Sequence, residues 1–150
     1  MWHLVGLIEN IDDEHDLRFR AENDATTGLS NHTATQDLVA SALADASVRR
    51  HSVCVALDID DFKQVNDTYG HIEGDTLLHE VGKVLRSSFR ESDVLGRVGG
   101  DEFLLLLKNI DLEVALDKLE QVKRQLAAVK GRLAGKSPVG QHGRVCAGRR

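Results

Sequence analysis

The stretch Arg97-Val98-Gly99-Gly100-Asp101-Glu102-Phe103, followed by four leucines at 104–107, carries the clearest structural signal in this sequence. Two adjacent glycines predict a hairpin turn between the expected strand Val94–Val98 and the apolar run that follows. Asp101 and Glu102 come directly after the turn, although buried strands rarely hold paired acids. Exposed acids at a glycine turn, which a phosphate chain can approach closely, favour a metal-nucleotide site. A solvated acidic hairpin is the alternative for the turn taken alone.

Length and composition indicate one domain. The chain has 150 residues, 41% of them hydrophobic but only 4% aromatic, so aliphatic side chains must fill the core. No apolar run is long enough to span a bilayer, and the first residues lack the pattern of a signal peptide. The two cysteines, Cys54 and Cys146, match neither a disulfide framework nor a zinc spacing. We therefore expect a cytoplasmic protein.

The charge is divided unevenly along the chain. Residues 131–150 contain five basic residues and no acid. Subtracting this +5 from the net charge of −5 leaves −10 for residues 1–130. An acidic domain argues against a broad nucleic-acid surface, so no nucleic-acid partner is expected. Such a domain needs cations if it is to hold a nucleotide.

Hydrophobic periodicity predicts the order helix, strand, helix, hairpin, helix. A strand flanked by helices and followed by an antiparallel hairpin indicates an α+β sheet with helices on its faces. The expected elements are a strand end at Val5–Ile11, a charged helical connector at Asp12–Glu22, a loop at Asn23–Asn31, a helix at Thr33–Val48, a strand at His51–Ile59, a short helical turn at Phe62–Val65, a helix at about Asp75–Arg90, the hairpin, and a helix at Asp111–Lys130.

Acidic residues follow the central apolar strand. Asp58, Asp60 and Asp61 lie at its carboxyl end, where charges are unfavourable unless a cation or a partner compensates them. Carboxylates suit Mg²⁺, which prefers one or two of them together with substrate phosphates. Lys63 is a candidate point charge for a phosphate. The alternative is a polar junction in which Asp60 or Asp61 caps the following turn.

Two acidic segments in one small sheet strengthen the metal-site interpretation. If the strand that ends at Asp58 pairs with the hairpin, Asp58 and Asp101 fall at the same edge and can share a metal. Asn66 and Asp75 are candidates for reading a base edge, because an amide both donates and accepts hydrogen bonds and a carboxylate accepts them. Their alternatives are a turn residue and an acid near a helix N-terminus.

Four separated motifs resemble the GGDEF domain, the catalytic module of diguanylate cyclases. They lie in order between residues 24 and 110, so chance is a poor explanation. The first, Asp-Ala-Thr-Thr-Gly-Leu-Ser-Asn at 24–31, has Thr26 where the family usually has leucine. The others are Asp-Ile-Asp-Asp-Phe-Lys-Gln-Val-Asn-Asp at 58–67, Gly-His-Ile-Glu-Gly-Asp at 70–75, and the stretch at 97–103. The resemblance implies a ferredoxin-like, nucleotidyl-cyclase-like α+β sheet.

The resemblance also implies an activity. Members of the family join two GTP molecules into cyclic di-GMP with Mg²⁺ (or Mn²⁺), each of two facing domains of a homodimer holding one GTP. The implied roles are metal binding by Asp58, the backbone carbonyl of Ile59 and Asp101, completion of the acidic catalytic site by Glu102, phosphate binding by Lys63 and the backbone amides of Asp61 and Phe62, and guanine recognition by Asn66 and Asp75.

A further match concerns regulation. Arg90-Glu91-Ser92-Asp93 fits the R-x-x-D site at which the family binds its product and is inhibited by it. An arginine fork suits guanine or phosphate. The alternative is a charged helix end, with Arg90 placed near the negative end of the helix dipole.

The two ends of the chain depart from the family pattern. Its C-terminal strand and last helix are missing, so we expect an incomplete GGDEF domain at residues 24–130 and a disordered basic tail at 131–150. Residues 1–23 resemble the last strand of a PAS sensor and a linker helix, although an ordinary strand and helix start fit as well. Three functions stay open: an active cyclase, a module that binds GTP or cyclic di-GMP without turnover, and a non-functional truncated fragment.

Overall fold

The computed structural model describes residues 17–133, 135 and 146–148. Residues 17–22 are helical and lead into a loop that ends at Asn31. The elements that follow are α2 (His32–Ala44), α3 (Ala46–Arg50), β1 (Val53–Asp58), α4 (Phe62–Tyr69), α5 (His71–Ser88), β2 (Val94–Arg97), β3 (Glu102–Leu107), α6 (Leu112–Leu133) and β4 (Cys146–Gly148).

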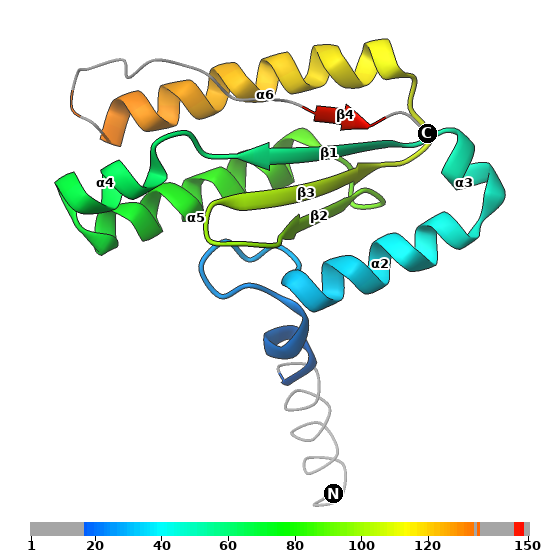
Figure 1. Cartoon of the computed structure of the whole chain (residues 1–150), viewed down its shortest axis with the longest axis horizontal. Helices are drawn as coiled ribbons and strands as arrows, with labels where there is room; N and C mark the ends of the chain where they lie inside the picture. The colour runs from blue at the N-terminus through cyan, green and yellow to red at the C-terminus, as the bar shows by residue number, and fades with distance from the viewer. Residues whose placement is uncertain (1–16, 134, 136–145, 149–150) are drawn as a thin grey trace, which may run out of the picture.

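The sheet has the strand order β2-β3-β1-β4, and each neighbouring pair is antiparallel (Figure 1). The two glycines form the turn between β2 and β3, as the sequence predicts. In the register of the central pair, Asp58 lies opposite Glu102 and Val55 lies opposite Leu105. The acidic end of β1 is therefore brought beside the glycine turn.

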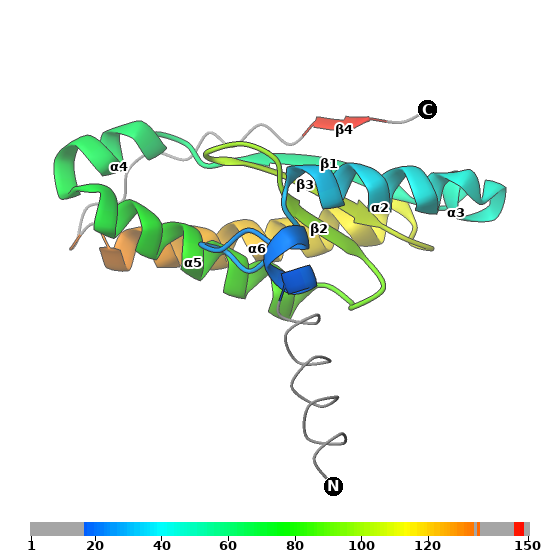
Figure 2. The same ribbon diagram turned by 90° about the horizontal axis from the view of Figure 1, so that it is seen from below.

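The hydrophobic core lies between one face of the sheet and the helices α5 and α6, which run side by side across that face (Figure 2). Alternation along the strands explains this arrangement, because successive side chains point to opposite faces. Val55, Phe103 and Leu105 point into the core and are almost fully buried. Asp58 and Glu102 belong to the alternate set and are exposed. The observed architecture is thus the expected α+β fold.

Several helix boundaries differ from the prediction, and α5, for example, begins at His71 instead of at about Asp75. The helix expected at Thr33–Val48 is divided at Asp45, whose carboxylate accepts a hydrogen bond from the Ser47 amide at 2.8 Å and so begins a new helix. The short turn expected at Phe62–Val65 continues to Tyr69 as α4. A single glycine, Gly70, separates α4 from α5 with a positive φ of 90°, a conformation that glycine adopts readily.

Within the segment 131–150, which the sequence predicts to be a disordered tail, residues Cys146–Gly148 form a strand, β4. This three-residue strand pairs antiparallel with β1, opposite Cys54–Ala56. Without it, the outer edge of β1 would present unpaired amide and carbonyl groups, and the extended segment satisfies them. Three residues are too few to give a periodic signal in the sequence. The expected PAS-like strand at Val5–Ile11 lies outside the described residues.

Candidate active site

The two acidic segments meet where β1 and β3 end. Asp58, the last residue of β1, lies opposite Glu102 at the start of β3. The amide of Ile59 donates to the carbonyl oxygen of Asp101 at 3.1 Å, which extends the pairing by one step. Asp58 and Asp101 therefore come from directly adjacent, hydrogen-bonded segments. The predicted meeting of Asp58 and Asp101 at one edge is confirmed.

Electrostatic repulsion is concentrated at this edge. Desolvation raises the pKa of Asp58, and the hydrogen bond with Asp101 and the negative charges of Asp101, Glu102 and Asp60 raise this pKa further. A cation placed among these groups would relieve the repulsion. The hard carboxylate oxygens fit Mg²⁺. Within residues 17–133 no group of three or more Asp, Glu, His or Cys side chains is already arranged around a metal position.

The loop from β1 to α4 has an unusual backbone. Asp61 adopts a left-handed conformation, with φ 57° and ψ 27°, and starts α4 without a side-chain cap hydrogen bond. The alternative in which Asp61 caps the helix is therefore not what the structure shows. Helix N-termini attract anions through their amides and dipole. Lys63 is exposed on the first turn of α4.

Asn66 and Asp75 come from consecutive helices that pack closely. A Cβ atom added to Gly74 would lie 1.8 Å from the side-chain oxygen of Asn66, so only glycine lets α4 approach α5 here. Asp75 follows Gly74 directly and is exposed. The structure thus brings the two candidate base-reading residues to one helix junction.

Arg90 and Asp93 are bound to each other at the opposite end of the hairpin. The Asp93 carboxylate lies 3.6 Å from Nε of Arg90 and accepts hydrogen bonds from the amides of Arg90 and Lys108, each at 3.0 Å. The Arg90 guanidinium donates to the Lys108 carbonyl at 2.6 Å. The Asp93 side chain is 2% exposed and that of Arg90 is 51% exposed. Asp93 therefore joins the end of α5 to β3, and Arg90 retains an accessible surface.

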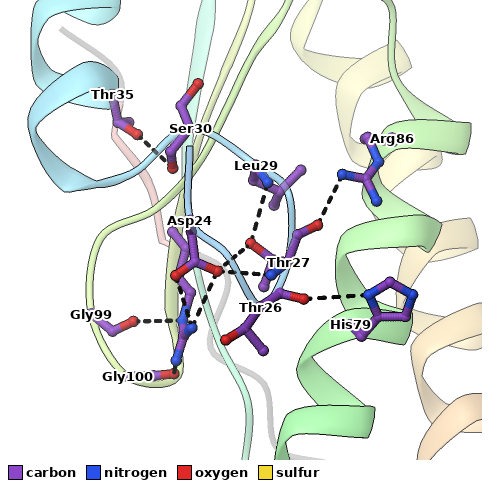
Figure 3. Close-up of polar contacts among 11 residues, drawn as sticks. Asp24, Thr26, Thr27, Leu29, Ser30, Thr35, His79, Arg86, Gly99 and Gly100 are labelled. Carbon is purple, nitrogen blue, oxygen red and sulfur yellow. Dashed lines mark hydrogen bonds and ion pairs between the residues drawn. The ribbon is translucent and has the colours of Figure 1, made fainter. Parts of the chain in front are cut away.

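An unpredicted ion pair ties the loop before α2 to the glycine turn (Figure 3). The Arg97 guanidinium lies 3.1 and 3.2 Å from the two carboxylate oxygens of Asp24. The same guanidinium donates to the carbonyl oxygens of Gly99, at 3.1 Å, and of Gly100, at 2.7 Å. Arg97 therefore holds the backbone just before Asp101.

The loop is also fastened by its own hydrogen bonds. The Asp24 carboxylate accepts from the amide and hydroxyl of Thr27 at 2.8 and 2.7 Å. Burial acts to raise the pKa of Asp24, but the Thr27 hydrogen bonds and the Arg97 charge outweigh it and lower the pKa. On the side of α5, Arg86 donates to the Thr27 carbonyl at 2.9 Å, and the ring Nδ1 of His79 lies 3.3 Å from the Thr26 carbonyl (Figure 3).

Asp24 and Arg97 both lie in the family motifs, but the sequence alone does not assign them to each other. They are 73 residues apart, and no local pattern links them. Nor does the sequence indicate the contact of Lys130, whose amine donates to the Asp60 carbonyl at 2.6 Å across 70 residues.

The family model described as "Diguanylate cyclase, GGDEF domain" matches residues 21–142. The chain belongs to the GGDEF family. Among solved structures, the coiled coil and GGDEF domain of DgcB from Caulobacter crescentus, in complex with c-di-GMP, is similar with a TM-score of 0.74 and 28% identity. That similarity covers 84% of this chain and 67% of the DgcB chain.

Curated GGDEF relatives carry different activities in their names. The cyclic di-GMP phosphodiesterase PdeR of Escherichia coli K12 is 47% identical over 93 residues, which cover 62% of this chain and 14% of PdeR. A diguanylate cyclase of Vibrio cholerae is 34% identical over 129 residues, covering 83% of this chain and 40% of the relative. The chain thus spans less than half the length of these two relatives. Across residues 17–133, 135 and 146–148, no helix is both long and apolar enough to cross a membrane.

Proposed function

We propose that this GGDEF chain is a diguanylate cyclase-type domain that condenses two GTP molecules into cyclic di-GMP and releases pyrophosphate. The observation that carries the proposal is the meeting of Asp58 and Asp101 at the ends of two paired strands. The start of α4, which lacks a side-chain cap, follows three residues later. Carboxylates beside an exposed helix N-terminus suit a metal-bound triphosphate.

Mg²⁺ or Mn²⁺ would be held by Asp58, the Ile59 carbonyl and Asp101, with Glu102 adding negative charge beside them. When bound, the metal supplies charge stabilisation at the α-phosphate and makes the 3′-hydroxyl a better nucleophile. The repulsion that raises the pKa of Asp58 supports this assignment, because a divalent cation would compensate it. Asp58 and Asp101 are both partly or fully accessible to a ligand from outside the core.

The remaining residues would bind and orient GTP. Lys63 and the backbone amides of Asp61 and Phe62 would hold the phosphates at the start of α4. Asn66 and Asp75 would recognise guanine at the junction of α4 and α5, with the amide donating and accepting and the carboxylate accepting from N–H groups. A second copy of the chain would present its own GTP, and alignment of the two substrates would supply much of the rate enhancement.

The direct test is turnover by the purified chain. GTP is incubated with the protein and Mg²⁺, and cyclic di-GMP and pyrophosphate are quantified by chromatography. We expect product from the wild-type chain and none from Asp101→Ala, which lacks one of the two converging carboxylates. Equal product from the two proteins, or none from either, would contradict the proposal.

A second candidate is a module that binds cyclic di-GMP without turnover. The accessible guanidinium of Arg90 favours it, because its Lys108 contact leaves about half of the side chain exposed. Calorimetry with cyclic di-GMP tests this candidate. We expect binding that Arg90→Ala weakens by about tenfold or more, since a bidentate arginine contact is typically worth more than a neutral hydrogen bond. Affinity unchanged by Arg90→Ala would count against it.

A further inference from the structure

A residue of α6 forms a hydrogen bond with the backbone of the loop that joins β1 to α4. Lys130, in the last turns of that helix, donates from its amine to the carbonyl oxygen of Asp60 at 2.6 Å. Lys130 is itself partly buried. Its amine therefore makes a charge-assisted hydrogen bond in a partly desolvated setting, where such bonds are stronger than those between neutral groups.

The held carbonyl lies in the middle of the segment that the proposed function uses. Asp58 and Ile59 precede it, and the amides of Asp61 and Phe62 follow it. Asp61 is a non-glycine residue with φ 57°, a conformation that side chains disfavour and that persists only where the surroundings enforce it. An anchored carbonyl on the preceding residue is such an enforcing contact.

Lys130 also brings positive charge to an acidic region. Several acids lie at this end of the sheet, namely Asp58, Asp60, Asp61, Asp101 and Glu102. The Lys130 amine reaches the Asp60 carbonyl from α6. Lys130 and Asp61 both line a hollow of about 110 Å³ between α4, α5 and α6. The other lining residues are Gln64, Val65, Thr68, Tyr69, Glu73, Leu77 and Leu133.

We propose that Lys130 is a positioning residue, whose amine sets the backbone of residues 59–62 for a metal-bound nucleoside triphosphate. The role rests on the proposed function, since that function makes these backbone groups ligands. An ordinary alternative is that Lys130 stabilises α6 through the helix dipole. That alternative predicts no effect on the β1–α4 loop, so the two are separable.

The test compares Lys130→Met, which keeps the length but loses the amine, with Lys130→Arg, which keeps charge and donors. Lys123→Met is the control, because Lys123 lies on the same helix and its amine pairs with the exposed Glu120 at 2.9 Å. The probe is guanosine 5′-(α,β-methylene)triphosphate with Mg²⁺, which binds without releasing pyrophosphate. Calorimetry gives its dissociation constant, and hydrogen exchange reports on the amides of residues 59–62.

We expect Lys130→Met to weaken nucleotide binding by about tenfold and to speed exchange in this loop, since a hydrogen bond from a charged group contributes at that level. Lys130→Arg should recover most of the affinity, and Lys123→Met should match wild type. Lys130→Met behaving like Lys123→Met in both measurements overturns the proposal, as do equal losses in Lys130→Met and Lys130→Arg. If the wild-type chain binds no nucleotide, the proposed function fails, and exchange at residues 59–62 alone decides the positioning role.

Discussion

At the scale of single residues, the site is defined by a carboxyl group held in an unfavourable electrostatic position. Desolvation raises the pKa of Asp58, and the neighbouring Asp101, Glu102 and Asp60 raise it further. The folded protein therefore binds a proton at Asp58 more readily than the unfolded chain does. Stability is lost as the pH rises through the window between the unfolded pKa and the raised folded pKa, because the ionised form is disfavoured only in the fold.

This repulsion predicts how Asp58→Asn behaves. At neutral pH the variant should melt a few degrees above wild type, and the difference should shrink as the pH falls below the ordinary range of an aspartate. Mg²⁺ should raise the melting temperature of wild type and leave that of Asp58→Asn unchanged. Thermal melts over a pH series with and without Mg²⁺ give both results. A variant less stable than wild type at neutral pH would contradict the interpretation.

The ion pair between Asp24 and Arg97 gives a second prediction. The two side chains are 21% and 17% exposed, so removing one partner leaves a largely buried charge unpaired. We expect Asp24→Asn to lower the free energy of unfolding by about 1–3 kcal/mol. It should also reduce any cyclase activity, because Arg97 holds the Gly99 and Gly100 carbonyls.

The exposed pair of Arg18 and Glu22 supplies the control for that ion pair. Their side chains are 80% and 60% exposed and 4.0 Å apart, so Arg18→Gln should change stability very little. Denaturant unfolding of both variants makes the comparison. Equal losses of unfolding free energy in Asp24→Asn and Arg18→Gln would show that the buried pair stabilises the fold no more than the exposed pair does.

At the scale of elements, the close approach of α4 and α5 depends on Gly74. We expect Gly74→Ala to push the helices apart, because its Cβ would collide with the Asn66 side chain, and to lower both the melting temperature and the affinity for GTP. Gly131→Ala is the matched control, since its Cβ meets nothing within 4 Å and alanine stabilises a helix by about 0.5–1 kcal/mol relative to glycine. Melting curves and nucleotide titrations of the two variants decide the matter.

The elements also show what sequence reasoning can reach. The β2–β3 hairpin was predictable, because the glycine turn fixes its register. The pairing of β1 with β3, which brings Asp58 to Asp101, followed from the sequence only as a condition, because two continuous apolar runs define no register. The helix break at Asp45 was harder to predict. Aspartate is a common helix cap, and here Asp45 accepts from the Ser47 amide, but the apolar spacing continues across it and indicates one helix. The contacts of Arg97 with Asp24 and of Lys130 with Asp60 join distant segments. Such contacts are fixed by tertiary packing and leave no periodic trace.

At the scale of the whole molecule, the short strand β4 completes the sheet beside β1. Removing residues 146–150 should expose the backbone groups of Cys54–Ala56, lower the melting temperature and promote association between chains. Calorimetry and size-exclusion chromatography measure the two effects. A cooperative thermal transition in the full chain would also exclude the hypothesis that this chain is a poorly folded fragment. Unchanged behaviour after truncation would mean that β4 contributes no protection in solution.

The alternation of side chains along β1 and β3 has a wider consequence. Val55 and Leu105 face inward with α5 and α6, whereas Asp58 and Glu102 face the other way. The core and the proposed ligand site thus lie on opposite faces at this end of the sheet. We therefore expect substitutions among the outward acids to alter or abolish the proposed activity without unfolding the domain. A chain of this architecture can change its function while it keeps the same core.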